Sequence, residues 1–116
     1  MNDMKLDVYE EEARYYKVLM HPLSLAILDL LRDGEHCVCH MEAVFGLRQA
    51  YISQQLMVLR SAGVVEVRRE GLNIYYRVTQ PKIYAVIDAM RQLTQTQPAF
   101  PLQPVVACNC PSCELI

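Results

Sequence analysis

The sequence predicts a mainly α-helical domain with one small β-hairpin. Residues 47–63 repeat apolar side chains at helical spacing and stop at a glycine, which is typical of a helix end. The next residues alternate apolar and polar side chains, so 64–69 is expected to pair with 74–78 across a turn at 70–73. A shorter helix at 38–45 is expected to precede them across a Gly-containing turn. Helix, turn, helix and hairpin in this order predict a winged helix-turn-helix.

The longer of these two helices has one apolar face and one small, polar face. Its apolar stripe consists of Ile52, Leu56 and Leu59. Ser53 and Gln54 lie on the other face, where they would be exposed. An ordinary amphipathic core helix has the same periodicity, so the pattern alone leaves both interpretations open.

The distribution of charge favours DNA binding for this part of the chain. Residues 48–77 hold five arginines and two glutamates, whereas residues 1–47 hold four basic and nine acidic side chains. Arg68 and Arg69, on the hairpin, are expected to contact DNA phosphates. Because the net charge of the whole chain is −2, any DNA binding must depend on a local basic patch.

Two further helices are expected before the helix-turn-helix. Residues 5–20 carry apolar side chains at helical spacing, and a run of acidic side chains lies near the start of this segment. Pro22 is well placed to open a second helix, which ends at Asp33 and Gly34. His21, just before the proline, is expected to be a capping or packed residue and not a metal ligand.

A last helix, opened by Pro81, carries a continuous apolar stripe as far as Leu93. A domain of this size has too little core to bury the whole stripe. We therefore assign this helix and the first one to a homodimer interface, which also suits the reading of two-fold DNA half-sites. The alternative is a helix packed wholly inside its own monomer.

Length and composition limit the remaining possibilities. The chain has 116 residues, enough for one domain, which is expected at 1–97. Residues 98–116 are expected to form an extended Cys-rich tail, whose first part, 98–107, is rich in proline. No apolar run is long enough to span a membrane and no signal peptide opens the chain, so a cytoplasmic protein without a membrane partner is expected. There is no nucleophile-base constellation and no Gly-rich phosphate loop, so the sequence does not predict an enzyme.

With these elements in place, residues 13–95 resemble the ArsR/SmtB family of metal-sensing repressors. The segments HPLSLAILDLL, EHCVCHMEAVFGL, LRSAGVVEVRREG and IYYRV follow one another in the family's order. The resemblance implies DNA reading by Gln49, Ser53 and Gln54. It also implies a metal site at Cys37 and Cys39, because members of the arsenic and cadmium/lead branches carry Cys-Val-Cys at the start of the third helix.

The chain departs from the family pattern at several positions. Arg48 stands where a Ser often caps the recognition helix, and we include it among the expected DNA contacts. Ser24 or Leu25 stands where the family often has Arg, and Gln55 where it often has His. The resemblance implies no zinc site on the last helix, because Asp88 is present there without a later histidine.

Cys37 and Cys39 can bind one ion together only under a particular backbone geometry. On a regular helix, side chains two residues apart point about 200° away from each other. At a helix N-terminus the backbone can stay extended, and side chains at i and i+2 then fall on the same side. Helix N-terminal amides also lower the pKa of a thiol and so favour the thiolate that metals bind. The alternative is a pair of small buried apolar residues.

The tail holds a second group of thiols. Its cysteines are Cys108, Cys110 and Cys113. Thiolate sets select soft ions, and ten tether residues can span at most ~33 to 36 Å, so the tail could reach Cys37 and Cys39 of either protomer. The alternative is a tail with incidental cysteines.

These features together predict a repressor that holds duplex operator DNA as a homodimer and releases it on binding a thiophilic ion. Arsenite or antimonite is the first expected inducer, with cadmium or lead next. The alternative is a thiol redox or persulfide sensor on the same scaffold, which switches by forming a disulfide between Cys37 or Cys39 and a tail cysteine.

Overall fold

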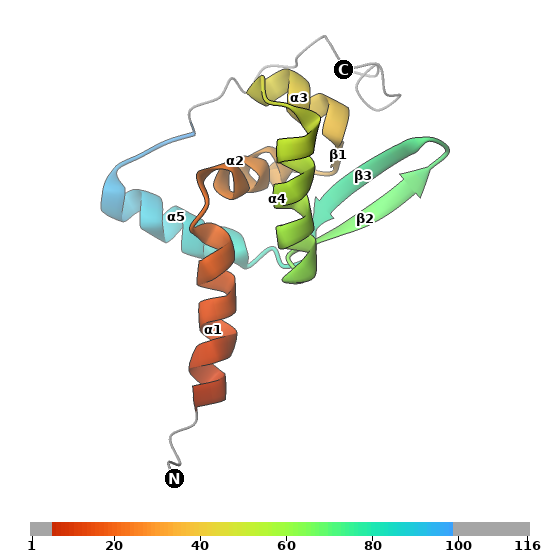
Figure 1. The fold of residues 1–116 in the computed structure, drawn as a ribbon. Coiled ribbons are helices and arrows are strands. Elements are labelled where there is room, and N and C mark those ends of the chain that lie inside the picture. The colour runs from red at the N-terminus through yellow and green to blue at the C-terminus, as the bar shows by residue number, and fades with distance from the viewer. Residues whose placement is uncertain (1–5, 99–116) are drawn as a thin grey trace.

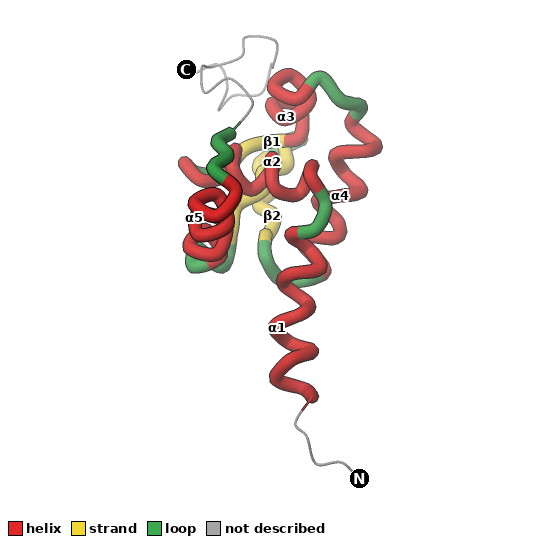
Figure 2. Tube along the Cα trace, turned by 90° about the vertical axis from the view of Figure 1, so that its left-hand side faces the viewer, coloured by secondary structure: helices red, strands yellow, loops and turns green. Residues whose placement is uncertain are grey.

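The computed structural model describes residues 6–98 and consists of packed helices with a small sheet at one side (Figure 1). In chain order the elements are α1 (Leu6–Leu19), α2 (Pro22–Leu30), the 3₁₀ turn η1 (Leu31–Asp33), β1 (His36–Cys37), α3 (Val38–Phe45), α4 (Gln49–Ser61), β2 (Val65–Glu70), β3 (Asn73–Val78) and α5 (Ile83–Thr94). Helix α1 and the β2–β3 hairpin project from the body in different directions (Figures 1 and 2). The expected mainly helical fold with one hairpin is confirmed.

The helix-turn-helix consists of α3 and α4. Helix α3 ends at Gly46, whose φ of 66° lies in the left-handed region that glycine adopts without strain. The turn brings α4 across α3, and the expected apolar stripe of α4 is buried in the core. Its members Ile52, Leu56 and Leu59 are all fully buried. This burial fixes which face of α4 is left for solvent.

The hairpin differs in detail from the expected pairing. The ladder runs from Val65 opposite Val78 to Glu70 opposite Asn73. It therefore begins one residue later than expected and closes through a two-residue turn at Gly71 and Leu72 instead of a four-residue one. Gly71 has a φ of 62°, the positive value that such tight hairpin turns need. The result is a longer wing, with Leu72 fully exposed at its tip.

The sheet also contains a strand that periodicity did not predict. The short strand β1 pairs with β3, so the order across the sheet is β1-β3-β2. His36 lies opposite Tyr76, and Cys37 lies opposite Tyr75. Two residues are too few to show an alternation in a sequence. The strand matters because it joins the start of α3 directly to the wing.

The apolar stripe of α5 is only partly used within the chain. Ile83 and Ile87 are buried in the core, whereas Val86, Met90 and Leu93 are exposed. A groove of about 630 Å³ is lined by side chains of α1, α2 and α5. None of the helices among residues 6–98 is long and apolar enough to cross a membrane.

Candidate DNA interface and cysteine site

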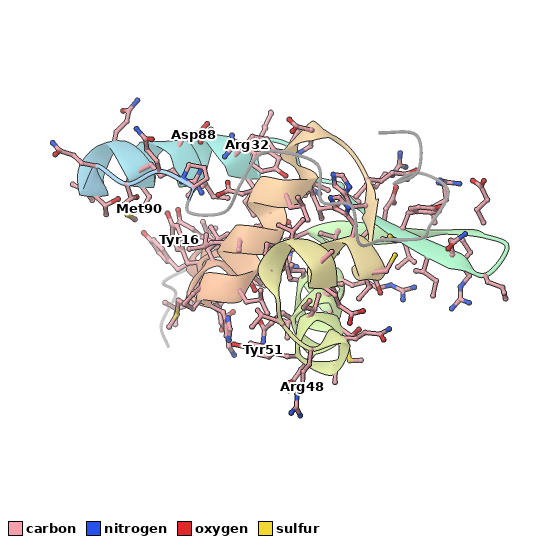
Figure 3. All side chains as sticks on the ribbon, turned by 90° about the horizontal axis from the view of Figure 1, so that it is seen from above. Tyr16, Arg32, Arg48, Tyr51, Asp88 and Met90 are labelled. Carbon is pink, nitrogen blue, oxygen red and sulfur yellow. The ribbon has the colours of Figure 1, made fainter. Side chains whose placement is uncertain are left out.

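The N-terminal end of α4 presents polar side chains to solvent. Arg48 occupies the N-cap position, and its side chain points away from the body (Figure 3). Gln49 and Gln54 are also exposed, whereas Ser53 is half-buried. Of the three expected base-reading residues, Ser53 is therefore the least accessible. Met57, one turn beyond, is 67% exposed and extends the same surface.

A buried hydrogen bond between α2 and α4 lies behind this surface. The hydroxyl of Ser24, fully buried, donates to Oε1 of Gln55 at 3.2 Å. Both side chains were noted as candidate departures from the expected pattern, Ser24 as an alternative to Leu25, and here they are hydrogen-bond partners. The bond ties α4 to α2 on the buried side of α4, so it helps to fix the rotation of α4 about its axis.

His21 is a helix cap, as expected. Its Nδ1 accepts a hydrogen bond from the backbone N–H of Leu23 at 3.1 Å, at the start of α2. Its ring also meets the edge of Tyr51 on α4, with centroids 5.9 Å apart. His21 therefore joins the starts of α2 and α4, and it takes no part in the cysteine site.

The two wing arginines that were expected to bind phosphate have different surroundings. Arg68 donates from Nε to both carboxylate oxygens of Glu35 at 3.1 Å and from Nη1 to Glu70 at 2.6 Å. Its hydrogen bonds to Glu35 hold the pKa of that carboxyl below its usual value, and they raise the pKa of Arg68 itself. Arg69 is exposed, and within residues 6–98 no carboxylate lies within ion-pair distance of it.

The cysteine pair lies where β1 passes into α3. Cys37 is the N-cap of α3, with extended backbone angles of φ −88° and ψ 164°. The Sγ atoms of Cys37 and Cys39 approach to 2.7 Å. Cys37 is buried and Cys39 is exposed, so one sulfur can be reached from solvent. The extended N-cap thus produces the convergence that a regular helix would prevent.

The sulfur of Cys37 also caps helix α3. The backbone N–H of His40 donates to its Sγ at 3.4 Å, which satisfies one of the open donors at the start of α3. The rings of His36 and His40 stack beside the pair, with centroids 4.6 Å apart. Burial lowers the pKa of both imidazoles, and for His36 the neighbouring His40 lowers it further.

The described residues do not complete a metal centre. Within residues 6–98, no group of three Cys, His, Asp or Glu side chains is gathered around one position. A third sulfur would have to come from Cys108, Cys110 or Cys113, which lie outside the described residues. On α5, the carboxylate of Asp88 is bound by Arg32 at 3.0 and 3.2 Å (Figure 3).

Comparisons with known proteins identify the family and the fold of this chain. Residues 21–67 match the family described as "Bacterial regulatory protein, arsR family". A biofilm growth-associated repressor of Xylella fastidiosa is 39% identical over 87 residues, which cover 75% of this chain and 76% of the relative. This chain belongs to the arsR family. Members of this family are transcriptional regulators and not enzymes.

Solved structures of other proteins support the same assignment. The crystal structure of the transcriptional repressor BigR from X. fastidiosa superposes with a TM-score of 0.69 at 35% identity, covering 82% of this arsR-family chain and all of BigR. The homodimeric winged helix-turn-helix DNA-binding domain of Mb0332 from Mycobacterium bovis gives a TM-score of 0.70 at 32% identity, covering 84% and 94% of the two chains.

Sequence reasoning missed several residues at the interface of this arsR-family chain. Glu35 and Tyr75 surround Arg68, yet they are 33 and 7 positions away from it and share no motif. Ser24 and Gln55 are separated by 31 residues. The polar character of these two side chains was the available signal, because a buried polar group needs a hydrogen-bond partner.

Proposed function

We propose that this chain is a repressor that binds operator DNA as a homodimer and releases it when Cys37 and Cys39 capture a thiophilic ion. Arsenite or antimonite is the first proposed inducer, with cadmium or lead next. The observation that carries the proposal is the approach of the two sulfurs to 2.7 Å at the N-cap of α3. Two convergent thiols, one of them exposed, are suited to a soft ion and unsuited to a hard one.

Homodimer formation is supported by the apolar side chains that the monomer leaves exposed. They line both sides of the groove between α1 and α5, including Tyr16, Met20, Val86 and Met90. Figure 3 shows Tyr16 and Met90 extending into the same region from the two helices. The M. bovis relative is itself described as homodimeric. A two-fold dimer would present two α4 helices to two half-sites.

The proposed switch acts through α3. Cys37 caps this helix with the same sulfur that captures the ion, so drawing Cys37 and Cys39 onto one centre must reorient the start of α3. The first turn of α3 then adjusts, and α3 packs against α4. An ion that prefers the adjusted state weakens DNA binding by its differential affinity, typically ~1 to 3 kcal/mol of coupling.

The tail supplies the remaining ligands in this proposal. Two thiolates leave any of the candidate ions short of donors, and the described residues offer no third. Cys108, Cys110 and Cys113 are therefore proposed to close a site shared with Cys37 and Cys39, from the same protomer or its partner.

A titration of the fully reduced full-length protein tests the proposal. The DNA is a labelled duplex selected from a random library, followed by fluorescence anisotropy, and the ions are arsenite, antimonite, Cd²⁺ and Pb²⁺. We expect at least one ion to release the wild type, whereas Cys37→Ser with Cys39→Ser keeps DNA affinity near normal and is not released. A double variant that is released normally by every ion would refute the mechanism.

Thiol redox or persulfide sensing, through a disulfide between Cys37 or Cys39 and a tail cysteine, is the second candidate, and the exposure of Cys39 favours it. It requires an oxidant or a persulfide donor, whereas ion binding does not. Release by a mild oxidant, together with no response to any ion under full reduction, would select this alternative.

A further inference from the structure

Arg68 sits in a row of residues that crosses the whole sheet. Its Cα lies opposite Tyr75 on β3, and Tyr75 in turn lies opposite Cys37 on β1. Residues in register on neighbouring strands direct their side chains to the same face. The Arg68 guanidinium accordingly stacks over the Tyr75 ring, 4.7 Å from its centroid, and Tyr75 is buried. The cysteine site and the wing are thus two ends of one cross-strand row.

The ion pair between Arg68 and Glu35 also joins the wing to the segment at the start of β1. Glu35 immediately precedes β1, and both of its carboxylate oxygens accept from Nε of Arg68 at 3.1 Å, with a further contact of 2.5 Å from Nη2. Glu70 takes Nη1. The planar guanidinium is therefore held by two carboxylates and a ring, which leaves few donors for a phosphate.

The other wing arginines lack this connection. Side chains alternate along β2, so Arg69 faces the side opposite to Arg68 and is exposed. Arg77 pairs with Glu66, but both belong to the β2–β3 hairpin, and their ion pair does not reach β1. Of these three, Arg68 is the one whose guanidinium is hydrogen-bonded to Glu35 beside β1, whereas Arg77 acts on Glu35 only through its charge.

We propose that Arg68 is a positioning residue: its pair with Glu35 fastens the wing to β1 and so transmits changes at the cysteine pair to the wing. The wing's phosphate contact is then Arg69. The transmission part rests on the proposed function, because it needs an event at Cys37. The positioning part does not, since it concerns DNA binding without any inducer.

The salt dependence of DNA binding tests the positioning part. Affinity of the full-length protein for the selected duplex is measured over a range of salt, with Arg68→Gln and Arg69→Ala compared. A lost phosphate contact lowers the slope of log K against log salt by about 0.9 per contact. We expect that drop for Arg69→Ala, and a weaker affinity with an almost unchanged slope for Arg68→Gln. A drop of the same size for Arg68→Gln would overturn the assignment.

Release by arsenite tests the transmission part. The ratio of DNA affinities without and with arsenite is measured for Glu35→Gln, with Glu66→Gln as the matched control that breaks the pair confined to the hairpin. Glu35→Gln should reduce this ratio about 2- to 30-fold, whereas Glu66→Gln should leave it unchanged. Arsenite binding without DNA should be the same in both, which excludes a damaged ion site.

Arg68→Lys tests transmission a second time, without removing a charge. Lysine keeps the charge that a phosphate would need but not the planar fork that holds Glu35. Its release ratio should fall as in Glu35→Gln. Unchanged ratios in both variants, beside a wild type that responds to arsenite, would overturn transmission. A wild type that responds to no ion would overturn the proposed function and transmission with it, and the salt slopes would still decide the role of Arg68.

Discussion

The buried bond between Ser24 and Gln55 gives a sharp test of how α4 is held. Ser24→Ala removes only a hydroxyl from a fully buried position, and it deprives Gln55 Oε1 of its donor. Leaving one buried partner unsatisfied costs about 1 to 3 kcal/mol of unfolding free energy. Gln55→Met leaves the serine hydroxyl behind instead. The serine hydroxyl then stays buried without its acceptor, so this cost should also lie at about 1 to 3 kcal/mol.

The double variant Ser24→Ala with Gln55→Met should be more stable than the sum of the single effects predicts. Replacing both partners by apolar groups of similar shape is often nearly neutral, so most of the loss should be recovered. Urea denaturation at fixed protein concentration measures all four proteins. Single effects that add within about 0.3 to 0.5 kcal/mol would mean that the bond contributes nothing, and the account of α4 would be wrong.

Three further predictions concern DNA contact, the cysteines of the tail and the stability of the fold at alkaline pH. Gln54→Ala should weaken binding to the selected duplex by ~1 to 3 kcal/mol with ion affinity unchanged; unchanged binding in both this variant and Ser53→Ala would exclude α4 as the reader. Replacing the three cysteines within 108–113 by Ser should impair release almost as severely as loss of the α3 pair; intact release with fewer ions bound per protomer would indicate separate sites. Burial raises the pKa of Tyr84 from 10.0 to about 12, so the stability contributed by its protonated form is present below pH 10 and lost as pH rises toward 12. The urea midpoint of Tyr84→Phe should decline less over that window, and an equal decline would contradict the shift.

The fold was predictable where a pattern repeats over many residues. The stripe of α4 and the alternation of the wing each span several turns or pairs, and their positions were correct to within one or two residues. The N-cap geometry of Cys37 was predictable for another reason. Only an extended backbone lets thiols at i and i+2 meet, so the expectation that Cys37 and Cys39 share one ion demanded a helix start at that point.

The remaining features depend on contacts between distant segments. Strand β1 exists because β3 offers it an unpaired edge, and no property of two residues predicts that. Arg68 and Arg69 are identical in sequence terms, and only strand alternation together with the position of Glu35 separates a paired arginine from an exposed one. Ser53 was expected to be exposed and is half-buried, because neighbours in space and not periodicity set the final exposure.

The N-cap bond of Cys37 gives the proposed sensor an adjustable threshold. Capture of the inducer must shift the first turn of α3, which the Cys37 sulfur caps, so the concentration of inducer needed for release depends on how firmly α3 holds that turn. Substitutions in α3 that raise helix propensity should make the repressor less sensitive, and those that lower it should make it more sensitive, with every ligand atom unchanged. Selection or engineering could thus match one cysteine chemistry to dilute or concentrated surroundings by altering a short helix alone.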